Sequence, residues 1–117
     1  MHIAGGNYFL LTFMGVKPPM KMDPGMEKTI TDKAEIAKQL KASFDHLRKA
    51  VIETQDKNLE KMTEMFGSTV TYRNVLFTVM SHLHEHLGQS IAYARTNGVV
   101  PPWTAAEQAA AAKKDSK

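Results

Sequence analysis

Apolar residues recur at helical spacing between residues 32 and 54. Ile36, Leu40, Phe44, Leu47 and Val51 follow one another at intervals of three or four, which places them on one face of a helix. Asp32 lies just before this pattern, and Glu35 comes three residues after Asp32. This combination is typical of a helix N-terminus. The pattern therefore predicts a helix over about residues 32–54, with that stripe as its apolar face.

A second long helix is predicted from Thr69 or Thr71 to Asn97. Gly98 suits its C-terminal cap, and Pro101 and Pro102 cannot continue it. One face of this helix begins with apolar residues and continues with polar ones. Its members are Val75, Val79, His82, His86, Gln89 or Ser90, and Tyr93. Because His82 and His86 continue an otherwise apolar face, we expect both to point inward.

Residues 1–14 also fit a helix, with His2, Gly6, Phe9 and Phe13 close to one face. Adjacent glycines each cost roughly 1 kcal/mol in a helix interior, so their presence suggests close packing against a neighbour. The segment lacks the basic start of a signal peptide and is too short for a membrane span of about 20 residues. We interpret it as a core element.

The remaining segments carry weaker patterns. Prolines and glycines in residues 15–29 predict a long loop without regular structure. Residues 55–71 are a connector, in which a short turn of helix before Gly67 is neither required nor excluded. We expect one bundle domain over residues 1–103 and an Ala/Lys-rich tail over 104–117 that is a frayed helix or disordered.

Composition limits the chemistry that the chain can perform. A chain of 117 residues, 43% of them hydrophobic, suits one domain with one core. It contains no cysteine, which excludes disulfides, thiolate metal sites and a cysteine nucleophile, and which is compatible with the cytoplasm. The net charge of +3 comes from scattered lysines, without the arginine-rich stripe of a nucleic-acid binder. We expect no nucleic-acid or membrane partner.

The string HLHEHLGQ, residues 82–89, places two imidazoles one helical turn apart. Spacing of i, i+4 aims His82 and His86 at one point, as in half of a metal site. His84 lies about 200° round the helix from His82 and should face elsewhere. The alternative is a pair of buried histidines with only a structural role, and spacing alone does not decide between the two.

Several familiar helical sites are absent. The chain has no HExxH zinc motif, no Glu-x-x-His pair of a di-iron bundle and no GxSxG nucleophile elbow. A third metal ligand must therefore come from another helix, with His2, His46 or a carboxylate as candidates. His46 lies about 200° from Phe44 on its helix, which favours a solvated position.

The C-terminal half resembles the last helix of the DinB family, the DinB/YfiT-like metal-dependent enzymes. The family pattern is H-x-x-x-H-x-x-Q, then Y-x-R, a glycine and two prolines, which fall here on His82, His86, Gln89, Tyr93, Arg95, Gly98, Pro101 and Pro102. The opening HIAGGNYF resembles the family helix that carries the third ligand. The resemblance implies an all-α fold, an up-down four-helix bundle with three long helices in this chain.

By resemblance, His2, His82 and His86 bind zinc, nickel or a similar ion, and Gln89 and Tyr93 line the pocket for substrate or cosubstrate. Family members carry a further helix before the first histidine, which this chain lacks. Its absence predicts an exposed apolar flank, covered in a homodimer or by a swapped helix. A truncated form is the other explanation.

The resemblance implies a small-molecule substrate and metal-activated attack by a thiol or by water on an electrophile, in a thiol S-transferase or a hydrolase. A transferase would need a low-molecular-weight thiol cosubstrate, since the chain has no cysteine. Glu85 lies about 100° from the ligand face, so no general base is evident near the histidines. The alternative is a non-catalytic metal-binding helical dimerisation module.

Overall fold

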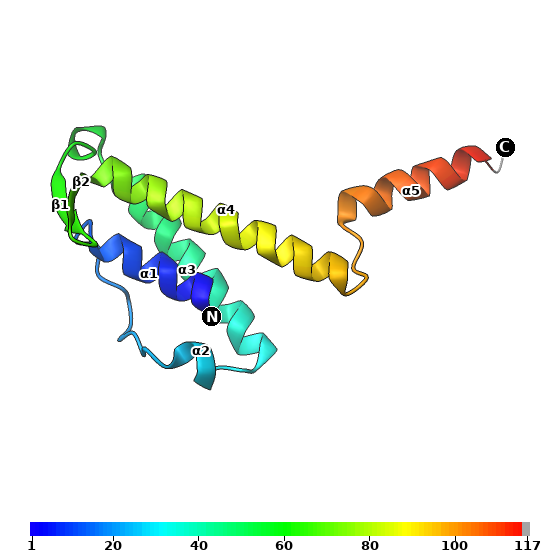
Figure 1. Ribbon diagram of the computed structural model, residues 1–117, viewed down its shortest axis with the longest axis horizontal. Helices are drawn as coiled ribbons and strands as arrows, with labels where there is room; N and C mark the ends of the chain where they lie inside the picture. The colour runs from blue at the N-terminus through cyan, green and yellow to red at the C-terminus, as the bar shows by residue number, and fades with distance from the viewer. Residues whose placement is uncertain (116–117) are drawn as a thin grey trace. The chain divides into compact units, whose positions relative to one another are not determined.

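A computed structural model describes residues 1–115 and is mostly helical (Figure 1). The elements follow in the order α1 (His2–Thr12), α2 (Met26–Thr29), α3 (Lys33–Glu53), the 3-10 turn η1 (Asp56–Asn58), β1 (Met62–Met65), β2 (Ser68–Thr71), α4 (Tyr72–Thr96) and α5 (Pro102–Asp115). The predicted all-α class is confirmed. None of the helices in these 115 residues is both long enough and apolar enough to cross a membrane.

The chain divides into two compact units, Met1–Leu83 and the part from His84 onward. The division falls inside α4, which is one unbroken helix. The first unit contains α1, α2, α3, the hairpin and the first three turns of α4. The second contains the end of α4 and α5.

The core of the first unit lies among α1, α3, the hairpin and the start of α4. Helices α1 and α3 run side by side (Figure 1). The buried cluster consists of Leu10, Leu11, Met14, Leu47, Ala50, Met65, Val75 and Val79. Burying each large apolar side chain contributes about 1.5–3 kcal/mol relative to exposing it.

Helix α3 begins where the sequence predicts, because the Asp32 carboxylate accepts a hydrogen bond from the Glu35 amide at 2.9 Å. The predicted apolar face is wrong in part. Phe44 and Val51 are 42% and 47% exposed, whereas Ser43 and Ala50, one residue earlier, are buried. Small side chains at these two positions allow α1 to approach α3 closely, so packing overrides the stripe of larger residues.

Polar side chains join α1 to α3 within the core. Asn7 and Ser43 are both fully buried, and the Asn7 amide donates to the Ser43 hydroxyl at 3.1 Å. That hydroxyl in turn donates to the Leu40 carbonyl at 2.7 Å. A buried hydrogen bond of this kind fixes the register of the two helices, since a slip would leave the buried Asn7 amide without its acceptor.

Helix α1 is a core element as predicted, but its buried face differs from the face that carries His2. Ala4, Tyr8 and Leu11 are fully buried, whereas Phe9 is 50% exposed. The face with His2, Gly6 and Phe9 borders a pocket instead of the core.

Helix α4 follows its prediction closely. It ends at Thr96, and Gly98 follows with a φ of 74°. The Val99 amide then donates to the Ala94 carbonyl at 2.9 Å, as in a glycine-capped helix end. Val75 and Val79 are buried, whereas Tyr93, further along the predicted stripe, is 70% exposed.

Two weakly patterned segments contain structure that the sequence did not predict, and a third, the tail, forms one of the two states expected for it, a helix. The connector forms an antiparallel hairpin in which Met65 pairs with Ser68 across a two-residue turn. The predicted loop contains the single helical turn α2, and the predicted tail forms α5 up to Asp115. Residues 116 and 117 of the tail lie outside the described residues, and the domain boundary at residue 103 stays a prediction.

Candidate metal centre

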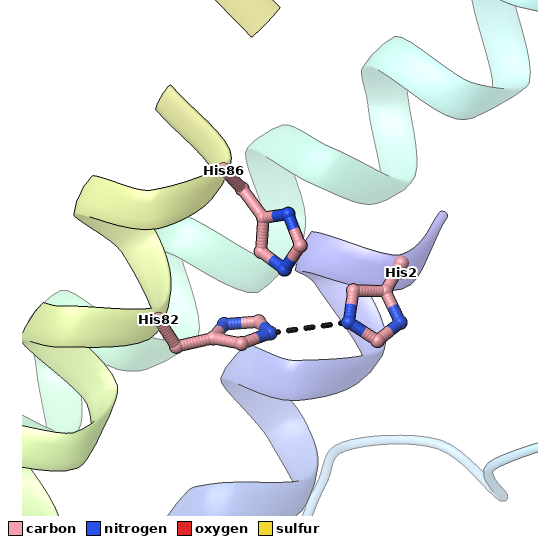
Figure 2. A group of neighbouring side chains, drawn as sticks. All are labelled: His2, His82 and His86. Atoms are coloured by element: carbon pink, nitrogen blue, oxygen red, sulfur yellow. Dashed lines mark hydrogen bonds between the residues drawn. The ribbon is translucent and has the colours of Figure 1, made fainter. Parts of the chain in front are cut away.

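Two histidines meet between α1 and α4. His2 opens α1 and His82 lies in the third turn of α4. Their Nε2 atoms are 3.3 Å apart and their ring centroids 5.2 Å apart (Figure 2). Residues 80 positions apart in the chain thus present the same ring nitrogen to one point.

The His82 ring lies against the backbone of Gly6. A β-carbon at residue 6 would stand 2.3 Å from Cε1 of His82 and 3.0 Å from each of its ring nitrogens. No side chain fits in that space, because real β-carbons essentially never approach closer than 3.0 Å. The prediction that a glycine of this helix packs closely against a neighbour is therefore confirmed at Gly6.

His86 lies one turn after His82 on the same helix. Its Nδ1 is 2.9 Å from the side-chain oxygen of Gln89. Because an amide oxygen only accepts hydrogen bonds, Nδ1 of His86 is the donor in this pair. The Gln89 side-chain nitrogen donates in turn to Glu85 at 3.3 Å, so Glu85 supports the orientation of His86 through Gln89.

Glu27 performs the same function for His2. Its carboxylate lies 2.7 Å from Nδ1 of His2, so that nitrogen carries the proton and Nε2 is left to face His82. Glu27 belongs to α2, within the segment for which a structureless loop was predicted. Sequence reasoning missed this residue because no local pattern relates α2 to the start of α1.

The geometry of the three histidines suits a metal ion. Their ligand nitrogens all lie within 4.8 Å of one another, and Figure 2 shows the three rings converging. A tetrahedral ion with bonds of about 2.05 Å needs ligand nitrogens about 3.3 Å apart, which matches the distance between His2 and His82. The largest separation exceeds this value by at most about 1.5 Å, a change within reach of side-chain torsions.

The chemistry of the donors agrees with this geometry. Neutral imidazole is a ligand for zinc and nickel, and two of the three rings have their distal nitrogen held by an oxygen acceptor. The three histidines therefore form a group that can hold a metal ion. Three protein ligands leave a fourth position for water or substrate, as in catalytic zinc sites.

The other two histidines lie elsewhere. His84 is exposed, as predicted. The expectation of a solvated His46 is wrong, since its ring lies 5.3 Å from that of Tyr8 and its Nε2 is buried. Burial, and to a smaller degree the nearby charge of Lys49, lowers the pKa of His46. Burial and the charge of Asp45 raise the pKa of the Tyr8 hydroxyl.

A pocket of about 480 Å³ opens beside His2 and His82. Its volume is in the range of small-molecule sites. Its apolar walls come from α1, from the segment leading into α2 and from the hairpin turn, and they include Phe9, Leu10, Met22, Pro24, Met26 and Phe66. The paired imidazoles thus border an apolar space large enough for a small substrate.

The fold and this histidine cluster define a helical protein with the donors of a metal centre. A family model described as the DinB superfamily matches residues 1–90. The chain therefore belongs to the DinB superfamily, as its sequence predicted. Comparison with curated proteins and with solved structures finds no match.

Proposed function

We propose that this chain is a metal-dependent enzyme in which a thiol or a water attacks a small electrophilic substrate. The observation that carries the proposal is the convergence of His2, His82 and His86 beside a pocket. When bound, zinc or nickel would act as a Lewis acid that lowers the pKa of a bound water to about 7, or binds a thiol as thiolate.

The residues of the chain have separate functions in this proposal. Glu27 and Gln89 accept hydrogen bonds from Nδ1 of His2 and of His86, which would orient both rings as ligands of a bound ion. The apolar pocket wall excludes water from the substrate. Tyr93 lies one turn beyond Gln89 on α4 and is 70% exposed, outside the residues that line the pocket. Its proposed contact with substrate or cosubstrate rests on the family resemblance alone. Because the chain contains no cysteine, a transferase would use a low-molecular-weight thiol, which fits a cytoplasmic location.

Metal analysis of untagged protein tests the site. We expect about one zinc or nickel ion per chain, retained by His84→Ala and lost by His82→Ala and His86→Ala. His84 is the matched control because it belongs to the same helix and is exposed. Equal metal content in all three variants would refute the ligand assignment.

Thiol cosubstrates are then screened with electrophilic acceptors, and Tyr93→Phe should raise KM for one of the two reactants.

A second copy of the chain is the proposed partner. Phe44, Val51 and Ile52 expose apolar surface on α3, and Ile52 is 69% exposed. Charges of both signs accompany them at Arg48 and Glu53. An apolar row with interleaved opposite charges suits a self-complementary interface between two copies of one helix.

Light scattering on the full chain measures this association. We expect a dimer that Ile52→Glu converts to a monomer, whereas Met62→Glu, at a hairpin position that is 59% exposed, leaves it intact. A folded wild-type monomer at all concentrations would contradict the proposal. A dimer that binds metal but turns over none of the screened substrates would instead support the second candidate, a metal-binding dimerisation module.

A further inference from the structure

We infer that the pocket beside His2 and His82 binds an uncharged aromatic group of the substrate, and that Phe66 determines this specificity. The inference rests on the proposed function, which concerns the electrophilic group of the substrate that reacts at the histidines. It adds the chemical class of the rest of the substrate, and it assigns a residue of the hairpin to the site.

Phe66 occupies a position that its side chain does not favour. It is the first of the two turn residues between β1 and β2, with a φ of 52°, and Gly67 follows with a φ of 80°. Two-residue hairpin turns of this kind prefer Asn, Asp or Gly at both positions. A bulky residue at positive φ is an outlier that persists only where its surroundings hold it, and such residues cluster at functional sites.

The surroundings of Phe66 lie on α1. Its ring is 5.2 Å from that of Phe13 and 6.2 Å from that of Phe9, measured between centroids. Even so, Phe66 is 68% exposed and Phe9 is 50% exposed. The turn therefore holds an aromatic side chain at the rim of the pocket with much of its surface open, and core packing does not account for that exposure.

Aromatic rings pack best against other rings in offset or edge-to-face arrangements. Phe9 and Phe66 are inclined by 45° to each other, and both border the pocket that His2 and His82 also line. A planar ring that enters the pocket meets these two aromatic surfaces, while a group attached to it reaches the imidazoles. The pocket volume of about 480 Å³ accommodates a substrate with one such ring.

The charges at the pocket select against an anionic group. Asp23 and Glu27 both border it. The Asp23 carboxylate accepts from the Gly25 amide at 2.8 Å, and Glu27 accepts from His2, so both stay in place. A carboxylate on the ligand ring would be repelled by these two groups and would lose its hydration among apolar walls.

Two hydroxamic acids distinguish the contribution of the pocket to binding from the contribution of the metal. Acetohydroxamic acid and phenylacetohydroxamic acid share a metal-binding head group, and only the second carries a ring. Calorimetric titration of the zinc-loaded full chain should show binding about tenfold or more tighter for the phenyl compound. The 4-carboxyphenyl analogue should lose most of that gain.

Phe66→Asn tests the assigned residue. Asn suits the turn, so we expect a Tm within a few degrees of the wild type, about threefold to tenfold weaker binding of phenylacetohydroxamic acid, and unchanged binding of acetohydroxamic acid. Phe77→Asn is the matched control, because Phe77 is 56% exposed on α4 and lies outside the pocket lining. Equal affinity for the two compounds, or equal effects of the two substitutions, would overturn the inference.

Failure of the metal site would give a different result from failure of the aromatic pocket. If acetohydroxamic acid does not bind to the protein, the proposed function fails, and the pocket is then tested with indole on metal-free protein by NMR. Indole shifts confined to the pocket and weakened by Phe66→Asn would sustain the inference without the metal. Absence of such shifts would refute it.

Discussion

The imidazole of His82 rests on the backbone of Gly6, in a space that a single added carbon would fill. A β-carbon at residue 6 would lie 2.3 Å from Cε1 of His82, whereas one at Gly5 would meet only the Met26 sulfur at an ordinary 3.9 Å. Two adjacent glycines of one helix therefore have different functions. Gly6 sets the position of a candidate ligand, and Gly5 does not.

Gly6→Ala should destabilise the protein and Gly5→Ala should stabilise it. The first forces the His82 ring away from α1, which we expect to cost about 1–3 kcal/mol and to weaken metal binding. The second removes backbone freedom from the unfolded chain and adds about 0.5–1 kcal/mol of stability. Thermal unfolding of both variants, with and without zinc, provides the measurement. Similar changes in Tm for the two would contradict the assigned contact.

Glu27→Gln should weaken metal binding without unfolding the protein. An amide replaces the charged acceptor for the Nδ1 proton of His2, and the loss of such a partner lowers metal affinity by about 10- to 100-fold. Competition with a chromogenic chelator measures the affinity, and ¹⁵N chemical shifts report which His2 nitrogen is protonated. Glu53→Gln, which alters an exposed carboxylate near Lys49, is the control. An unaltered His2 tautomer with unaltered affinity would exclude the positioning role.

His46 should make the protein less stable as the pH falls from about 7 to 5. The pKa of His46 in the folded state lies below its ordinary value of 6.5. As the pH falls, His46 is therefore protonated more readily in the unfolded chain, and this protonation stabilises the unfolded state relative to the folded one. The charged groups near His46 are Lys49, Lys17, Lys61 and Glu53, which line one pocket with it. Urea unfolding of His46→Gln should show a shallower loss of stability over this range. His84→Gln, at an exposed position, should keep the wild-type slope.

The hydrogen bond between Asn7 and Ser43 should appear as coupling between two substitutions. Asn7→Ala removes the donor and opens a cavity, at a cost of about 2–3 kcal/mol. Ser43→Ala leaves the buried Asn7 amide without its acceptor, at a cost of about 1–2 kcal/mol. Because each single change already breaks the bond, the double variant should cost less than their sum, by about 0.5–1.5 kcal/mol. Strict additivity in urea unfolding would show that the bond contributes nothing.

The parts of the fold that follow from local rules were predictable. Asp32 caps α3, and Gly98 ends α4, since both effects depend on a few neighbouring residues. The hairpin was missed because its strands have four residues each and its turn contains Phe66 in place of a residue with turn preference. The buried face of α3 was misassigned because the choice of Ser43 over Phe44 depends on how closely α1 approaches.

By itself, the sequence determined the three long helices, the spacing of His82 and His86, and the family, because helical period, caps and motif are properties of contiguous residues. The resemblance already grouped His2 with His82, but only the tertiary structure decided how closely the two rings lie, that Glu27 orients His2, and that Phe66 stands beside an apolar pocket. These relationships join residues that are distant along the chain. They depend on side-chain packing between elements, and no local preference encodes that packing.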